Sequence, residues 1–339
     1  MELNEIKKID VSKMYKIYDD WPKIARIAFN TKIKQVNFDN LDNIIFAGMG
    51  GSGAIGDIFT AILSKTNIHV SVVKGYLLPR TVNKKSLVVI TSVSGNTIEA
   101  ITVLKKAKEI GSKIIVFSSG GKIEEFCRKN KIEFRQIRIL HSPRASFAKY
   151  FYVILKTLQP IIPIKDEEIY ESINQLEKTK KKISSKNLSS NNPSLRLAKW
   201  LNEQPLIYYP AGLEAAAIRF KNSLQENAKI HVISEDVVEA CHNGIVAWGR
   251  KSNFKPILIL GKDDYKKTKE RWIVLKSFFK QNNIDFYEIK TTGTSIVTKI
   301  MDLIYLLDYA SIYKGIMLGE DPSPVIPIEY IKKKIDNQL

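Results

Sequence analysis

The first half of the chain alternates short apolar runs with longer amphipathic stretches. Each apolar run has the length and the β-branched content of a buried strand, and the runs lie at 43–48, 68–74, 87–93, 113–119 and 134–139. The stretches between them predict helices over 53–65, 96–110 and 122–130. Parallel strands need long crossover connections, which are usually helical. The alternation therefore predicts an α/β domain whose parallel sheet is covered on both faces.

Further helices flank this alternation, and a polar stretch ends it. One helix is predicted over 11–29, before the first strand, and another over 145–158, after the sequence SPR. At 184–194 serine and asparagine dominate, and Pro193 lies among them. Such composition is typical of a linker. The predicted organisation is a first domain at 1–183, the linker at 184–194 and a second domain at 195–339.

The second domain repeats the order of strand, loop and helix. Its apolar runs are PLIYYPAG (205–212), KIHVIS (229–234), PILILG (256–261) and IDFYEIK (284–290). Helices are predicted over 213–225, 264–281 and 295–313, and a basic helix closes the chain. We therefore expect two doubly wound parallel sheets of similar plan.

The composition is that of a globular protein. Hydrophobic residues make up 44% of the 339 residues and charged residues 26%. No apolar run reaches the roughly 20 residues of a membrane span. The N-terminus is charged and lacks the apolar core of a secretory signal, and two cysteines suggest no disulfide framework. We expect a soluble cytoplasmic protein with no membrane partner.

The formal net charge of +18 raises the question of a nucleic-acid partner. The lysines, however, are spread along the chain and often stand next to acids, as in KKTKER and KKAKEI. A nucleic-acid site would need them clustered on one face, so we expect none. A lysine-rich surface also attracts small anionic substrates.

A glycine-rich loop follows the first predicted strand in IIFAGMGGSGAIGD (44–57). Gly48, Gly50 and Gly53 have the G-x-G-x-x-G spacing of dinucleotide-binding proteins. In those proteins the next strand ends in an acid that holds the ribose, but here Lys74 stands at that end. A lysine would suit a 2′-phosphate, so a nicotinamide-dependent oxidoreductase remains an alternative.

The loop after the third strand carries a stronger signal. In ITSVSGNTIEA, Ser92, Ser94 and Thr97 lie between the strand and the start of a helix, together with Gly95. A helix N-terminus offers unpaired N–H donors and a partial positive charge, which suit a phosphate. Three hydroxyls in six residues exceed what capping requires. This loop is therefore the predicted phosphate site, with Gly51 and Ser52 placed beside the sugar.

Six motifs occur along the chain in the order GMGGSG, SVSGNTIE, SSGGK, SPRAS, QENAK and EACHN. In this order they resemble the sugar isomerase (SIS) domain proteins, and more narrowly the archaeal bifunctional phosphoglucose/phosphomannose isomerases. The resemblance implies two SIS-type domains. It also implies interconversion of glucose 6-phosphate, and of mannose 6-phosphate, with fructose 6-phosphate through a cis-enediolate. Neither a metal nor a cofactor is implied.

The resemblance also assigns residues to roles. Glu226 of QENAK matches the base that moves the proton between C1 and C2. His242 of EACHN matches the ring-opening histidine, which the family supplies from the other subunit of a homodimer. Arg144 of SPRAS matches the cation that stabilises the enediolate. A second ring-opening group, a lysine, matches Lys332, although one gap in the alignment would select Lys333.

The chain departs from the family pattern near its end. Dual-specificity members carry a threonine there that is associated with mannose 6-phosphate, and the matching position is Val325. Ser323 would take its place if the loop were shifted. A non-catalytic SIS sensor of phosphosugars is the main alternative to an enzyme. No separate DNA-binding segment precedes the first strand, and the presence of both Glu226 and His242 favours catalysis.

Overall fold

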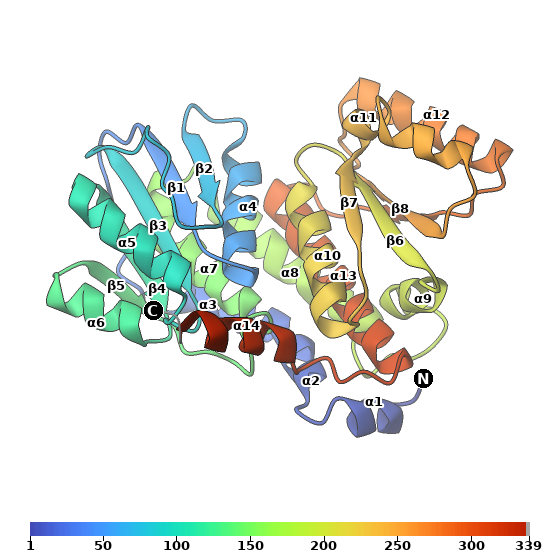
Figure 1. Ribbon diagram of the computed structural model, residues 1–339, viewed down its shortest axis with the longest axis horizontal. Helices are drawn as coiled ribbons and strands as arrows, with labels where there is room; N and C mark the ends of the chain where they lie inside the picture. The colour runs from blue at the N-terminus through green and yellow to red at the C-terminus, as the bar shows by residue number, and fades with distance from the viewer. Residues whose placement is uncertain (337–339) are drawn as a thin grey trace.

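The computed structural model describes residues 1–336 and contains two parallel sheets (Figure 1). The first sheet has the strand order β2-β1-β3-β4-β5, and every neighbouring pair is parallel. Its strands are β1 (Asn43–Ala47), β2 (His69–Val73), β3 (Ser86–Ser92), β4 (Lys113–Ser118) and β5 (Glu133–Gln136). The five strands predicted for the first half are therefore confirmed, although the last ends at Gln136 rather than at residue 139.

Helices cover both faces of this sheet. They are α4 (Gly51–Leu63), α5 (Ile98–Ile110), α6 (Lys122–Lys129) and α7 (Phe147–Leu158), each within a few residues of its predicted range. Alternate residues of β1 point to opposite faces. Ile44 and Phe46 pack in the core that contains α4 and α7, whereas Ile45 and Ala47 pack in the core that contains α5. Burial on both faces explains why β1 reads as an unbroken apolar run.

The second sheet has the order β7-β6-β8-β9 and is also parallel throughout. Its strands are β6 (Gln204–Tyr209), β7 (Ile233–Asp236), β8 (Phe254–Leu260) and β9 (Tyr287–Lys290). Its helices are α10 (Glu214–Asn227), α11 (Val237–Ala240), α12 (Lys266–Gln281) and α13 (Ile296–Met317). In both sheets the first strand of the half is flanked by the second and the third. The fold class of two doubly wound parallel sheets is confirmed.

A layer of helices joins the two halves. The long helix α13 packs against α8 (Asp166–Ile183), α9 (Pro193–Trp200) and α10, and α10 packs against α4 of the first half. Figure 1 shows α8, α10 and α13 between the two sheets. Nearly all of α13 is buried. Helices of both halves therefore share one apolar core.

The predicted linker connects α8 to α9 and is well packed. Ser184, Ser185 and Asn192 are buried, and the Asn192 side chain accepts a hydrogen bond from the Leu195 N–H at 2.9 Å, which caps α9. Pro193 is the first residue of that helix, where its missing N–H is not needed. The division into domains at 1–183 and 195–339 stays a prediction.

The single helix predicted over 11–29 is wrong. The N-terminal region instead forms α1 (Leu3–Ile9), α2 (Met14–Asp19) and α3 (Trp21–Asn30). Lys13 adopts a left-handed conformation with φ of 59°, which interrupts the helical path. The buried Asp10 carboxylate then accepts the N–H groups of Met14 and Tyr15 at 2.9 and 2.8 Å, so a new helix begins there.

The remaining elements are the short 3₁₀ helices η1 (Gln159–Ile161) and η2 (Gly244–Gly249), and the basic helix α14 (Ile326–Asp336) near the C-terminus. Among the described residues, none of the helices combines the length and the apolar character that a membrane span requires.

Candidate active site

The loop between β3 and α5 gathers the three predicted hydroxyls. The Ser92 hydroxyl donates to the Thr97 hydroxyl oxygen at 3.1 Å, and the hydroxyls of Ser94 and Thr97 lie 3.4 Å apart. Gly95 has φ of 73°, and a Cβ on it would lie 1.7 Å from the Gly120 carbonyl oxygen. Only glycine fits there, which locks this hydroxyl loop (residues 92–97) against the SSGGK loop. Its binding of phosphate stays a prediction.

The glycine loop (residues 48–53) lies between the end of β3 and the second half of the chain. A Cβ on Gly48 would lie 2.8 Å from the Thr91 carbonyl oxygen, just before the hydroxyl loop. A Cβ on Gly51, the first residue of α4, would lie 3.1 Å from Nη1 of Arg219 and 3.9 Å from Cα of Arg144. The absence of side chains therefore lets the backbone approach both arginines. Ser52 follows and is buried.

The dinucleotide alternative loses its support at Lys74. The Nζ atom of Lys74 lies 2.6 Å from a carboxylate oxygen of Asp57. A lysine paired in this way is already neutralised and is not free for a 2′-phosphate.

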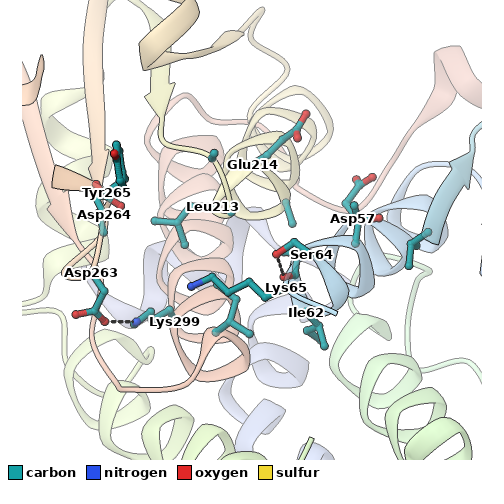
Figure 2. Close-up of a pocket in the computed structure, with 18 of the residues that line it drawn as sticks. Asp57, Ile62, Ser64, Lys65, Leu213, Glu214, Asp263, Asp264, Tyr265 and Lys299 are labelled. Atoms are coloured by element: carbon teal, nitrogen blue, oxygen red, sulfur yellow. Dashed lines mark hydrogen bonds and ion pairs between the residues drawn. The ribbon is translucent and has the colours of Figure 1, made fainter. Parts of the chain in front are cut away.

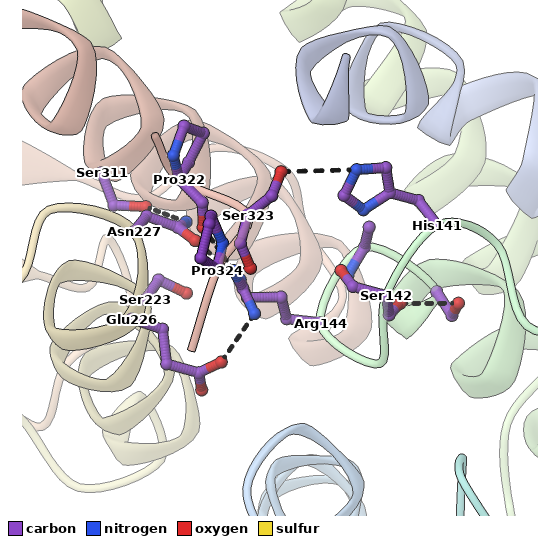
Figure 3. Close-up of polar contacts among 12 residues, drawn as sticks. His141, Ser142, Arg144, Ser223, Glu226, Asn227, Ser311, Pro322, Ser323 and Pro324 are labelled. Carbon is purple, nitrogen blue, oxygen red and sulfur yellow. Dashed lines mark hydrogen bonds and ion pairs between the residues drawn. The ribbon is translucent and has the colours of Figure 1, made fainter. Parts of the chain in front are cut away.

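Arg144 is the buried centre of the site, with 4% of its side chain exposed (Figure 3). Its Nε donates to the Asn227 side-chain oxygen at 2.7 Å. Its Nη2 donates to the carbonyl oxygens of Pro322 and Ser323, the latter at 2.8 Å. These bonds come from α10 and from the segment after α13. They fix the plane of the guanidinium and leave Nη1 directed towards Glu226.

Glu226 occupies the last turn of α10, and its Oε2 accepts a hydrogen bond from Nη1 of Arg144 at 3.0 Å. The glutamate side chain is 25% exposed, whereas the arginine is almost completely buried. The structure thus brings together two predicted residues that lie 82 positions apart in the sequence. One oxygen of the carboxylate is held by a fixed cation, while part of the group remains accessible from solvent (Figure 3).

The segment after α13 is fastened to the same place. The Nζ atom of Lys229 donates to the carbonyl oxygens of Glu226, Asp321 and Pro324 at 2.6, 3.1 and 3.0 Å. Burial and the nearby Arg144 lower the pKa of this lysine. The hydroxyl of Ser323 lies 3.4 Å from Nε2 of His141, a contact visible in Figure 3. Val325 follows and is half-buried.

Two predicted catalytic residues do not join this cluster within the chain. His242 follows α11 at the surface of the second half, and Lys332 lies on α14; both side chains are exposed. Among the side chains of residues 1–335, neither His242 nor Lys332 has a hydrogen-bond or ion-pair partner, and the same holds for Lys333. Their roles stay predictions.

A further cavity lies elsewhere. It has a volume of about 950 Å³ and opens at the carboxyl ends of β6 and β8, against the side of α4 (Figure 2). Carboxylates from Asp57, Glu214, Asp263 and Asp264 line it, together with Lys65 and Lys299. Lys299 is paired with Asp263, and no predicted site residue lines the cavity. Among the described side chains, which end at residue 335, no group of three or more His, Cys, Asp and Glu residues is arranged to hold a metal ion.

Two family models match the chain. The SIS domain model matches residues 38–135, which contain the glycine loop and the hydroxyl loop. The model described as the bacterial phospho-glucose isomerase C-terminal SIS domain matches residues 190–335, which contain Glu226 and Arg219. Each half of the chain thus matches a model of an SIS domain.

Relatives are similar to the chain over most of its length, and solved structures share its fold. A bifunctional phosphoglucose/phosphomannose isomerase from Caldicellulosiruptor bescii is 29% identical over 335 residues, which are 95% of this chain and 97% of the relative. A D-glucosamine-6-phosphate 4-epimerase from Sulfolobus acidocaldarius is 26% identical over 73% of this chain and 77% of its own. The crystal structure of a glucose-6-phosphate isomerase like protein from Thermus thermophilus has a TM-score of 0.63 at 14% identity, over 95% of both chains. The predicted resemblance to the bifunctional isomerases is confirmed.

Within this candidate site, several structural residues go unpredicted by the sequence. Asn227 and Lys229 belong to the QENAK motif, but only Glu226 is assigned a role from it. Arg219 and Asp308 form a buried ion pair of 2.7 Å beside Arg144. The signal for that pair is a single charge within an apolar stretch, in AAAIRF and in IYLLDYA. Charges in such positions are rarely buried without a partner.

Proposed function

We propose that this protein is an aldose–ketose isomerase that interconverts glucose 6-phosphate and fructose 6-phosphate without a metal. The observation that carries the proposal is the contact between Glu226 and Arg144 beside the glycine loop. A carboxylate and a fixed guanidinium at one point are the two groups that proton transfer next to a carbonyl requires. Relatives that align with most of the chain are named isomerases of phosphorylated hexoses.

The chemistry follows from the two side chains. Glu226 takes the proton from C2 of the open-chain aldose, and the C–H electron pair forms the C1–C2 double bond of a cis-enediolate. The negative charge then rests on the C1 oxygen, where Nη1 of Arg144 stabilises it. The proton of the C2 hydroxyl passes to the C1 oxygen, and Glu226 returns its proton to C1. The C1–C2 double bond is then replaced by a C2 carbonyl, which yields the ketose. Arg144 is already held by Asn227, Pro322 and Ser323, so little reorganisation is needed as the charge develops.

The phosphate has a place at the hydroxyl loop. Ser92, Ser94 and Thr97 offer three hydroxyls, and the first N–H groups of α5 add donors and a favourable dipole. Thr97 is the N-cap residue of α5, and its side chain caps no N–H of that helix. We place the sugar at Gly51 and Ser52, because the glycine loop begins against Thr91, just before the hydroxyl loop.

Ring opening requires a group from outside this cluster. We assign it to His242 of a second copy of the chain, with Lys332 or its neighbour Lys333 as the second group. The exposure of His242 leaves it free to enter the site of a partner. This makes the homodimer the active form. Val325 in place of the family threonine makes glucose 6-phosphate the preferred aldose, with mannose 6-phosphate second.

The decisive test is Glu226→Gln, which keeps the size of the side chain and removes the base. We expect kcat with fructose 6-phosphate to fall about a thousandfold, whereas wild-type protein treated with EDTA keeps its activity. Glu214→Gln is the matched control, since Glu214 lies in the first turn of the same helix. Full activity of the Glu226 variant would remove the proposed base. Loss of activity on chelation would contradict metal independence.

The shared site can be tested with two inactive variants. In a mixed dimer of Glu226→Gln and His242→Gln chains, one of the two sites keeps both residues. Random mixing should therefore restore about one quarter of wild-type activity, because half of the dimers are mixed and each has one intact site. No recovery after exchange of subunits would place His242 in the site of its own chain, and an active His242→Gln homodimer would place it outside catalysis. If the wild-type protein binds hexose 6-phosphates but does not convert them, the alternative of a non-catalytic phosphosugar sensor is favoured.

A further inference from the structure

A buried ion pair lies directly behind the candidate site. Arg219 of α10 and Asp308 of α13 are 3% and 0% exposed, and Nη2 of the arginine lies 2.7 Å from a carboxylate oxygen of Asp308. The Tyr18 and Ser223 hydroxyls also donate to Asp308, at 3.1 and 2.6 Å. The guanidinium packs on the Phe147 ring, with its carbon 4.4 Å from the ring centroid. The carboxylate is thus fully engaged, and the arginine cannot move without breaking this network.

The hydrogen bonds of Arg219 are distributed unevenly over its three nitrogens. Nε donates to Asp308, and Nη2 donates to Asp308 and, at 2.9 Å, to the carbonyl oxygen of Arg144. Nη1 has no hydrogen-bond partner among the described residues. It faces the glycine loop, where a Cβ on Gly51 would lie only 3.1 Å away.

Nη1 is not one of the completely buried side-chain atoms that lack a partner, so its N–H groups remain accessible on the side of the glycine loop. Charged donors in such a place favour an acceptor from a ligand. Nη1 carries two N–H donors, and the space in front of them belongs to the predicted sugar end of the site. The nearest backbone residue there, Gly51, is the one that leaves room. An incoming oxygen atom would satisfy these donors at no cost in rearrangement, because the rest of Arg219 is already fixed.

We propose that Arg219 is a second substrate-binding arginine, whose Nη1 donates to an oxygen of the sugar chain held beside Gly51. The oxygen belongs to the sugar rather than to the phosphate, because the hydroxyl loop already provides the phosphate site. The same guanidinium fixes the carbonyl of Arg144, so it sets the position of the sugar relative to the enediolate-stabilising group. The identity of the ligand rests on the proposed function.

The test is Arg219→Lys, with fructose 6-phosphate and inorganic phosphate as two probes. A lysine keeps the positive charge next to Asp308, but its single ammonium group cannot donate both to Asp308 and to a ligand beside the glycine loop. We expect kcat/KM for fructose 6-phosphate to fall about thirtyfold, as for the loss of a hydrogen bond from a charged donor. The inhibition constant of inorganic phosphate should change less than about threefold, because the phosphate loop is untouched.

Ser223→Ala is the control for the supporting network, because it removes a donor to Asp308 and leaves Nη1 in place. It should lower the melting temperature and leave KM within about twofold of the wild type. A folded Arg219→Lys protein with wild-type kcat/KM would overturn the proposal. An equal loss for inorganic phosphate would overturn the assignment to a sugar oxygen.

A binding measurement separates this proposal from the proposed function. Calorimetry gives the dissociation constant of fructose 6-phosphate for wild type and for Arg219→Lys whether or not turnover occurs. Binding of fructose 6-phosphate without turnover would reject the proposed isomerase activity. The ratio of the two dissociation constants would still show whether Nη1 of Arg219 contacts the sugar. In a crystal of Glu226→Gln with fructose 6-phosphate, Nη1 should lie about 3 Å from a sugar oxygen. A sugar bound away from Nη1 would overturn the contact.

Discussion

The two sheets have the same strand order over four strands, yet their carboxyl edges differ in what they offer to a ligand. At the first edge, α4, α5 and α6 begin after Gly50, Thr97 and Gly121, and none of these three residues caps its helix with a side chain. At the second edge, Asp236 and Ser295 cap α11 and α13 with their side chains, whereas α10 and α12 have no side-chain cap. The Lys122 N–H at the start of α6 donates to the Asn96 side-chain oxygen at 3.0 Å. The clearest difference is therefore at α5, whose start has no side-chain cap, whereas α11 and α13 are both capped.

Carboxylates of the protein itself occupy the second edge. Asp264 accepts the Gly261 N–H at 3.0 Å and the Trp272 indole N–H at 2.9 Å. Glu171 of α8 accepts the N–H groups of Thr294 and Ser295, next to the start of α13. A phosphate entering this edge would meet like charges at positions where a phosphate site needs donors.

The comparison teaches that the repeated fold alone does not make a phosphate site. Both edges have parallel strands, helix N-termini and a glycine-containing first loop. The difference lies in a few side chains, hydroxyls and glycines on one side and carboxylates on the other. The cavity at the second edge (Figure 2) is thus a poor candidate for an anionic substrate.

The largest effect is expected when a carboxylate is introduced at the first edge, because this removes the proposed difference between the two edges. Ser94→Asp places one in the hydroxyl loop, at an exposed position that tolerates the change in the fold. Repulsion of the phosphate should raise KM for fructose 6-phosphate about a hundredfold. Steady-state kinetics measures it. Ser64→Asp, the same substitution at an exposed residue lining the second-edge cavity, should leave KM unchanged. Equal effects would show that the two edges are not different for phosphate.

A second prediction concerns the glycines. Gly95→Ala puts a methyl group into the Gly120 carbonyl at a residue with positive φ, so we expect a loss of about 3 kcal/mol in unfolding free energy. Gly212 of the second edge also has positive φ, but nothing lies within 4 Å of its Cβ position. Gly212→Ala should therefore cost only about 1 kcal/mol. Urea unfolding of both variants checks this, and a larger loss for Gly212→Ala would contradict it.

The smallest effect is expected at Glu171. Partial burial raises the pKa of its carboxyl, but the hydrogen bonds from Thr294 and Ser295 outweigh it and lower the pKa to about 2. Because the pKa is lower in the folded state, the ionised carboxylate stabilises the folded protein at pH values above its ordinary pKa of 4.5. This stabilisation is lost as the pH falls from 4.5 towards 2. Glu171→Gln should cost about 1 kcal/mol at pH 7 and little at pH 2. Thermal unfolding between these pH values measures the difference, and a constant offset would contradict it.

Much of the fold is readable from the sequence because the central strands are buried on both faces. β1 and β3 are apolar over most of their length and buried at every position, a pattern that predicts buried parallel strands. The N-terminal helices are the exception, since Lys13 and Asp10 break a pattern that hydrophobic periodicity alone continues.

In the candidate site, too, some residues can be predicted from the sequence and others cannot. The hydroxyl loop is a local motif, so its residues are found by spacing alone. Arg144 and Glu226 lie 82 positions apart, and the family motifs were needed to pair them. Arg219 and Asp308 belong to no such motif, and their partnership exists only after α10 packs on α13. His242 and Lys332 depend on contacts that one chain does not make.

The anchoring of Arg144 has a consequence for how substrate enters. Its bonds to Asn227, Pro322 and Ser323, and the bond from Arg219 to its carbonyl, fasten the first half of the chain to the second at the reacting point. A hinge motion between the halves would break these hydrogen bonds and separate Arg144 from Glu226. Admission of the sugar therefore falls to local shifts of surface loops, and small-angle scattering should give one radius of gyration with and without fructose 6-phosphate.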